Sequence, residues 1–205
     1  MTKKGLFRRL SALTLSLWTV VCFGQSSYFP VGILDENPQA DKALRESYSK
    51  FLTALQEPSL WKSSQTRKIQ SYRFLWLRSF DRPISVRLDV QPDGTALLTT
   101  RMTSGKGGYE PGHLIEHRTK KLTKEQTGWF LDRIEELKFW SLPTSPPKDP
   151  NLVGVDGAEW VLEGIKNGQY HVVDRWSPDK GEVRTLGIVM LIDLAKLKLL
   201  YQDVY

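Results

Sequence analysis

Residues 155–178 read VDGAEWVLEGIKNGQYHVVDRWSP and contain two β-prone runs, 158–165 and 170–176, on either side of an Asn-Gly pair. Asn-Gly is typical of a two-residue hairpin turn, because both central residues of that turn need a positive φ. We therefore predict a β-hairpin whose turn residues are Asn167 and Gly168, and we use its register to assign side chains to faces.

The predicted register follows from counting outward from the turn. Ile165 faces Tyr170 and Trp160 faces Arg175, and successive side chains point to opposite faces. Both faces carry apolar residues, which favours a strand pair inside a sheet that is covered on both sides. One face holds Trp160, Leu162, Gly164, His171, Val173 and Arg175; the other holds Glu159, Val161, Glu163, Ile165, Tyr170, Val172, Asp174 and Trp176.

The first residues have the pattern of a secretory signal peptide. Four basic residues among the first nine precede an apolar run, 10–23, which gives way to Gly24-Gln25-Ser26. The apolar run is shorter than the roughly 20 residues of a membrane span. We predict a signal peptide over 1–26 and no stable membrane span after its removal; the alternative is an uncleaved segment that tethers the protein to the envelope.

Removing this leader changes the charge balance. The chain has 29 basic and 23 acidic residues, and because four of the basic ones lie in the leader, the remainder is close to neutral. Little net charge and no long basic run argue against nucleic acid as a partner. The one cysteine, Cys22, is also in the leader, so the remaining chain has no thiolate for a zinc site, an iron–sulfur cluster or a nucleophile. We predict no cofactor.

The rest of the chain alternates strand-like and helix-like patterns. Asn37-Pro38 offers a helix start and 123–126 a capping box. These patterns predict a single α+β domain over 27–205, whose first residues, 27–36, form a flexible leader. Its sheet is mainly antiparallel, with about six strands built from hairpins, and two or three helices pack on one face. The expected strands are 71–80, 84–90, 96–102, 113–121 and the two of the hairpin; the expected helices are 38–56, 124–140 and 182–201.

The segment 104–112, SGKGGYEPG, has four glycines in nine residues. Its spacing does not match a phosphate-binding loop. Glycine clusters between strands are usually turn chemistry, so a long hairpin connection is the favoured interpretation; a site of close backbone approach is the alternative.

A metal site would have to use the histidines. His113-Leu-Ile-Glu-His117 formally fits the H-x-x-E-H order of an inverted zincin, with His171 elsewhere. The segment reads as a strand, however, and on a strand residues four apart are about 13 Å from each other, too far for one ion. We therefore predict no metal centre.

The hairpin carries the candidate site residues. His171 lies opposite Gly164, which leaves space above it, and it is the one candidate catalytic residue, with carboxylates at Asp156, Glu159, Glu163 or Asp174. His171 and Asp174 should point to opposite faces, so they cannot form a direct pair. The candidate binding residues are Trp160 and Arg175, a possible cation–π pair, together with His171.

These patterns favour an exported, periplasmic or secreted, non-enzymatic binding or interaction module whose partner is a protein or a small molecule. A hydrolase that uses His171 with a nearby carboxylate is the alternative. A concave pocket around His171 would favour the hydrolase, and a His171 covered by a helix would favour the module.

Overall fold

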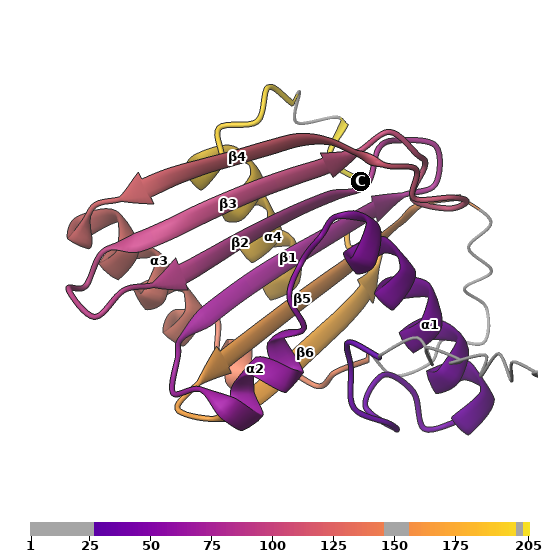
Figure 1. Cartoon of the computed structure of the whole chain (residues 1–205), viewed down its shortest axis with the longest axis horizontal. Helices are drawn as coiled ribbons and strands as arrows, with labels where there is room; N and C mark the ends of the chain where they lie inside the picture. The colour runs from indigo at the N-terminus through magenta and orange to yellow at the C-terminus, as the bar shows by residue number, and fades with distance from the viewer. Residues whose placement is uncertain (1–26, 146–155, 200–202) are drawn as a thin grey trace, which may run out of the picture.

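The computed structural model describes residues 27–145, 156–199 and 203–205, so the predicted signal peptide lies outside the described residues. Within the described residues, six strands form one antiparallel sheet in the order β4-β3-β2-β1-β5-β6 (Figure 1). The predicted α+β class and the antiparallel sheet are confirmed. The strands are β1 (Ser71–Arg78), β2 (Ile84–Val90), β3 (Ala96–Thr103), β4 (Leu114–Leu122), β5 (Ala158–Lys166) and β6 (Gln169–Trp176).

The β5–β6 hairpin has the predicted turn and register. Asn167 and Gly168 have φ values of 54° and 82°, which is the left-handed backbone that an Asn-Gly turn provides. Ile165 pairs with Tyr170 and Gly164 with His171. The assignment of side chains to faces therefore holds, and the contacts of each face can be read directly from the structure.

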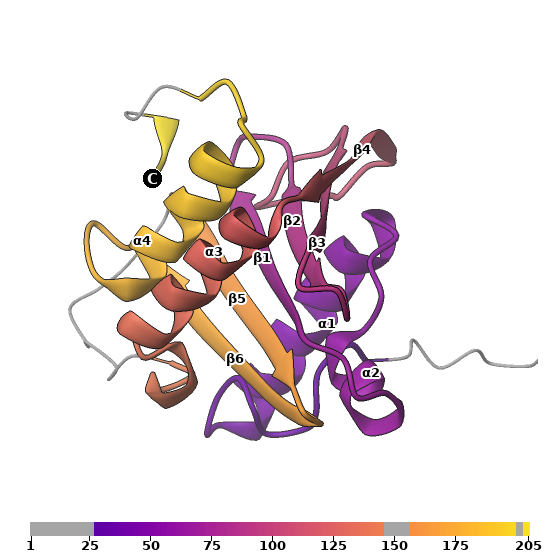
Figure 2. The ribbon, with the colours of Figure 1, turned by 90° about the vertical axis from the view of Figure 1, so that its left-hand side faces the viewer.

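Helices cover both faces of the sheet, whereas the sequence predicted them on one (Figure 2). One face is covered by α3 (Lys124–Glu136) and by α4 (Glu182–Ile188), which continues as a π-helix over Val189–Leu194. The other face carries α1 (Pro38–Ala54) and the short α2 (Leu60–Thr66). The α2 helix was not predicted from the sequence, because seven residues are too few to show a helical period.

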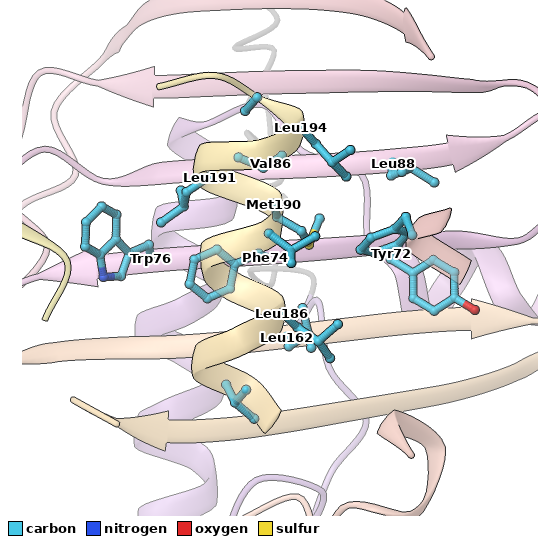
Figure 3. Packing of buried hydrophobic residues seen from close by; sticks show 14 of the residues in the cluster. Tyr72, Phe74, Trp76, Val86, Leu88, Leu162, Leu186, Met190, Leu191 and Leu194 are labelled. Atoms are coloured by element: carbon cyan, nitrogen blue, oxygen red, sulfur yellow. The ribbon is translucent and has the colours of Figure 1, made fainter. Parts of the chain in front are cut away.

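The core on the α3 and α4 face is built from aromatic side chains of β1. Tyr72, Phe74 and Trp76 alternate along the strand and are fully buried. The α4 helix passes over Phe74, with Trp76 and Tyr72 on either side of it (Figure 3). Trp160 of β5 packs against Phe74 and Trp76, with ring centroids 5.1 and 5.9 Å away. Burying each large side chain contributes about 1.5–3 kcal/mol, so this face is the main source of stability.

The α4 helix lies very close to the sheet at Gly187. A Cβ added there would lie 2.4 Å from Cζ3 of Trp160 and 3.0 Å from Cζ of Phe74. We expect Gly187→Ala to lower the free energy of unfolding by about 1–3 kcal/mol because both rings are held by the core. Gly128→Ala in α3 is the matched control, since nothing lies within 4 Å of its added Cβ; its helix propensity should stabilise by up to about 1 kcal/mol. Urea denaturation of both variants measures the difference, and equal effects would contradict the close packing.

Residues 27–36, expected as a flexible leader, pack beneath α1. Phe29 and Leu34 are buried in the cluster that α1 forms with the sheet. The buried carboxylate of Asp41 accepts hydrogen bonds from the backbone N–H groups of Gly32 and Leu34, and Arg45 pairs with it at 2.7 Å. These contacts hold the pKa of Asp41 below its usual value against the opposing effect of burial. The buried side chains of Phe29 and Leu34 and the hydrogen bonds to Asp41 therefore hold this segment against α1.

The C-terminal helix ends earlier than predicted. It was expected to reach residue 201, but its π-helical part ends at Leu194, and Lys196 has a φ of 52°, a left-handed conformation that stops a helix. The backbone oxygen of Tyr205 then accepts hydrogen bonds from the indole N–H groups of Trp76 and Trp160 at 3.1 and 2.9 Å. The last residues are thus tied to the sheet.

Across the described ranges 27–145, 156–199 and 203–205, no helix has both the length and the apolar character needed to cross a membrane.

Candidate ligand-binding groove

Trp160 is fully buried in the core. The guanidinium near its ring belongs to Arg184, 5.7 Å from the centroid, and Arg175 points elsewhere. Arg175 donates hydrogen bonds to the backbone oxygens of Thr144 and Pro143 at 2.8 and 2.9 Å. The two residues pair across the strands as expected, but their side chains do not form a common binding surface.

His171 lies under the short 3₁₀ helix Phe139–Ser141. Its ring is 5.0 Å from the ring of Phe139 and 6.1 Å from that of Trp140. The space expected above Gly164 is filled, because a Cβ added there would be 2.6 Å from Cε1 of Phe139. Burial lowers the pKa of His171, partly offset by the backbone oxygens of Leu142 and Phe139. Phe139 and Trp140 therefore cover the ring of His171.

The other two histidines lie at or near strand β4. His117 is an exposed residue of β4, and His113 Nδ1 is 3.1 Å from the hydroxyl of Ser104. Within residues 27–145, 156–199 and 203–205, no group of three His, Cys, Asp or Glu side chains is placed to hold a metal ion.

A charged network lies on the α1 face of the sheet. Arg73 of β1 is fully buried, and its Nε donates to Glu163 of β5 at 2.8 Å. Its Nη1 donates to the backbone oxygen of Pro58 at 2.6 Å and lies 3.6 Å from Glu57. The hydroxyl of Tyr170 donates to the second oxygen of Glu163 at 2.9 Å. The network is enclosed, so we assign it a structural role.

A pair of carboxyl groups lies further along the same face. Glu159 and Asp174 are on neighbouring strands, and the hydroxyl of Tyr48 from α1 donates to Asp174 at 2.8 Å. Burial and the Asp174 charge raise the pKa of Glu159 to about 8, and burial raises the pKa of Asp174 to about 6. The pair therefore retains a proton at neutral pH. Raised carboxyl pKa values occur at active sites and also in structural clusters; here the pair joins α1 to the sheet.

A solvent-accessible hollow of about 450 Å³ lies where the β1–β2 turn meets the glycine-rich loop. We call it the loop-end groove. Its lining residues come from the end of β1, the following turn, the facing ends of β2 and β3, the loop and the C-terminal segment: Arg78, Phe80, Asp81, Arg82, Ile84, Met102, Ser104, Gly105, Lys106 and Leu199. Its volume falls within the roughly 300–1,000 Å³ of small-molecule sites.

The glycine-rich loop is held against the turn by its backbone. Gly107 donates a hydrogen bond to the backbone oxygen of Asp81 at 2.9 Å, and Gly108 donates to that of Ser79 at 3.2 Å. A Cβ on Gly107 would lie 2.5 Å from backbone atoms of Leu77 and Arg78. The segment is the long connection of the β3–β4 hairpin, as the sequence favoured, and its glycines also allow close backbone approach, so they build one wall of the groove.

Arg78 is the most unusual polar residue of the groove. Only 9% of its side chain is exposed, and its Nε has no hydrogen-bond partner among the described residues. Its guanidinium lies over the Trp76 ring at 4.1 Å and pairs with Asp81 at 3.4 Å. Burial lowers the pKa of Arg78, although the carboxylates of Asp81 and Asp203 offset part of this effect. A buried donor without a partner is costly unless a ligand satisfies it.

Aromatic residues flank the groove. Phe80 and Tyr109 are 49% and 60% exposed, and their ring centroids are 6.1 Å apart. The hydroxyl of Tyr205 donates to Asp81 at 3.0 Å on the neighbouring side. Two large exposed rings beside a basic hollow are typical of a binding surface.

No sequence pattern predicted this groove. Its residues come from segments more than 100 positions apart, and only the glycine cluster gave a local signal. Phe80 was expected within the strand 71–80, whereas β1 ends at Arg78 and Phe80 is an exposed residue of the following turn.

No protein-family model matches the sequence, and a search of curated proteins found no significant match to it.

Proposed function

We propose that this chain is an exported, non-enzymatic binding module that binds a ligand with an anionic group in the loop-end groove. The observation that carries the proposal is the Arg78 side chain, which is almost completely buried, lines the groove and has an Nε without a hydrogen-bond partner in the described part of the chain. Arginine is suited to carboxylates and phosphates because its fork of N–H donors matches their oxygens.

The charge around the groove supports an anionic ligand. Arg82 and Lys106 line it with exposed side chains, while Asp81 is the one acidic residue among the lining residues that the structure describes. The basic leader pattern, which lies outside the described residues, supports export. Because the Phe80 and Tyr109 rings lie next to the basic residues, we expect the ligand to have an apolar part in addition to its anionic group.

To test this proposal, the protein is titrated with N-acetylglutamate while NMR monitors the Nε–H resonances of its arginines. We expect the Arg78 resonance to shift on binding. Arg78→Lys should weaken the affinity about 10–100-fold, since a hydrogen bond to a charged group contributes about 1.5–3 kcal/mol.

Arg133→Lys in α3 is the matched control: the Nε of Arg133 also lacks a hydrogen-bond partner among the described residues, but its side chain is 37% exposed, pairs with Glu136 and does not line the groove. Thermal unfolding establishes that both variants fold. An Arg78 resonance unmoved by carboxylates or inorganic phosphate, or equal affinity in the two variants, would refute the proposal.

A further inference from the structure

The loop-end groove continues into a second hollow of about 340 Å³. Ile84, Met102 and Leu199 line both hollows, so the two hollows are adjacent, and we treat them together as one channel, the extended groove. The second hollow adds residues from the edge strand β4 and from the segment after the π-helix: Glu116, Arg118, Lys196, Leu197 and Lys198.

The extended groove exists because the helix that covers this face stops short. Ile84, Met102 and Glu116 are cross-strand neighbours in one row across β2, β3 and β4. The π-helix ends at Leu194, and the left-handed Lys196 turns the chain along the rim. Ile84 is buried at one end of the row, Met102 and Glu116 are partly exposed, and the C-terminal segment borders the row.

Basic side chains lie at both ends of the extended groove. Arg78, Arg82 and Lys106 line the first hollow, and Arg118, Lys196 and Lys198 line the second. Of the acidic residues that line the described channel, Asp81 pairs with Arg78 and Glu116 pairs with Arg118. The net charge of the lining is positive at each end.

The middle of the channel is aliphatic. Ile84, Met102 and Leu199 separate the two basic ends. A ligand that satisfies all three parts must carry negative charge at both ends and apolar groups between them. A small anion would use one end only.

We propose that the ligand is an extended acidic peptide segment of a partner protein, with acidic side chains at both ends and aliphatic side chains in the middle. This inference rests on the proposed function, because Arg78 anchors one end of the peptide. Shallow grooves with charged rims suit peptides, whose side chains alternate along an extended backbone.

The probe is a fluorescein-labelled, capped decapeptide of six glutamates with four leucines in the middle, measured by fluorescence anisotropy. Two variants divide the channel: Arg78→Lys at one end and Lys196→Gln/Lys198→Gln at the other, where both lysines are exposed. Lys42→Gln/Lys68→Gln removes the same charge from exposed positions in α1 and after α2, outside the channel.

We expect the Lys196→Gln/Lys198→Gln variant to bind the probe about tenfold more weakly, because exposed charge pairs contribute up to about 1 kcal/mol each. Arg78→Lys should weaken binding at least as much, and the control variant should bind as the parent does. The same peptide with lysine in place of glutamate should not bind.

The outcomes separate the two proposals. Loss at Arg78 without loss at Lys196 and Lys198 would leave the anion site in place and overturn the extended peptide. No effect of either variant would refute both. Equal binding of an oligothymidylate or of vesicles containing phosphatidylglycerol, or equal weakening in the Lys42 and Lys68 control, would show that charge alone drives association and would overturn the peptide assignment.

Discussion

Arg73→Met is expected to lower the free energy of unfolding by about 3–5 kcal/mol, since removing one partner of a buried ion pair leaves the other charge uncompensated. Glu163 is fully buried and Glu57 almost so, and both lie within ion-pair distance of the Arg73 guanidinium. Methionine fills a similar volume, so the loss measures charge and hydrogen bonding more than a cavity. Urea denaturation at pH 7 provides the measurement.

A second substitution separates charge from packing. Arg73→Met/Glu163→Gln removes the stranded charge, and the amide oxygen can still accept from Tyr170, which donates to Glu163 at 2.9 Å. Glu57 keeps Arg87 and Arg101 at 3.2 and 3.3 Å. We expect the double variant to recover at least half of the lost stability. A single variant within about 1 kcal/mol of the parent would contradict the network.

The Glu159–Asp174 pair is expected to make stability fall as pH rises from about 5 to 8.5. The folded-state pKa of Glu159 is about 8 and that of Asp174 about 6, against ordinary values near 4 in the unfolded chain. At pH values between the unfolded-state and folded-state pKa values, the folded state binds more protons than the unfolded state. Its stabilisation is therefore complete at low pH and is lost as pH rises through the folded pKa values, by up to about 1.4 kcal/mol per pH unit for each group.

Glu159→Gln tests this pH dependence. The neutral amide cannot ionise, so the slope of stability against pH between 6 and 8.5 should flatten, and the variant should be more stable than the parent at pH 8.5. Glu136→Gln, whose side chain is 54% exposed, is the control and should keep the parental slope. Chemical denaturation at several pH values gives the slope; an unchanged slope in Glu159→Gln would contradict the shared proton.

The same pair connects α1 to the sheet through Tyr48. Because Tyr48 donates to Asp174, ionisation of both carboxyl groups places two negative charges beside the docking point of the helix. Hydrogen exchange of α1 amides should therefore increase at alkaline pH in the parent more than in Glu159→Gln.

The local patterns predicted most of the sheet. The Asn-Gly turn, the capping box at Thr123 and the alternation along β2 depend on residues a few positions apart, so the sequence alone specified them. Asn37 also caps α1 as predicted, with its side chain accepting from the N–H groups of Gln39 and Ala40. The position of α1 on the opposite face was not predicted, because both hairpin faces carry apolar residues and the pattern does not say which helix covers which face.

The candidate site residues show where such reasoning ends. His171, Trp160 and Arg175 were assigned to the correct face of the hairpin, but what lies above that face is decided by Phe139, Trp140 and Arg184, which come from other elements. From the sequence, Arg73 is simply a polar residue within a strand. Only its contacts with residues of β5 and of the segment before α2 show that it is fully buried.

Local sequence patterns were enough to predict the order of the strands and the turn and register of the hairpin, since hydrogen bonding and side-chain alternation act between near neighbours. Tertiary structure alone decided which charges are buried together and where the surface stays open. The loop-end groove combines residues near positions 80, 105 and 199, and the buried networks join β1 with β5 and α1 with β6. Such contacts depend on where the helices end and how they pack, and neither can be predicted from a local sequence pattern.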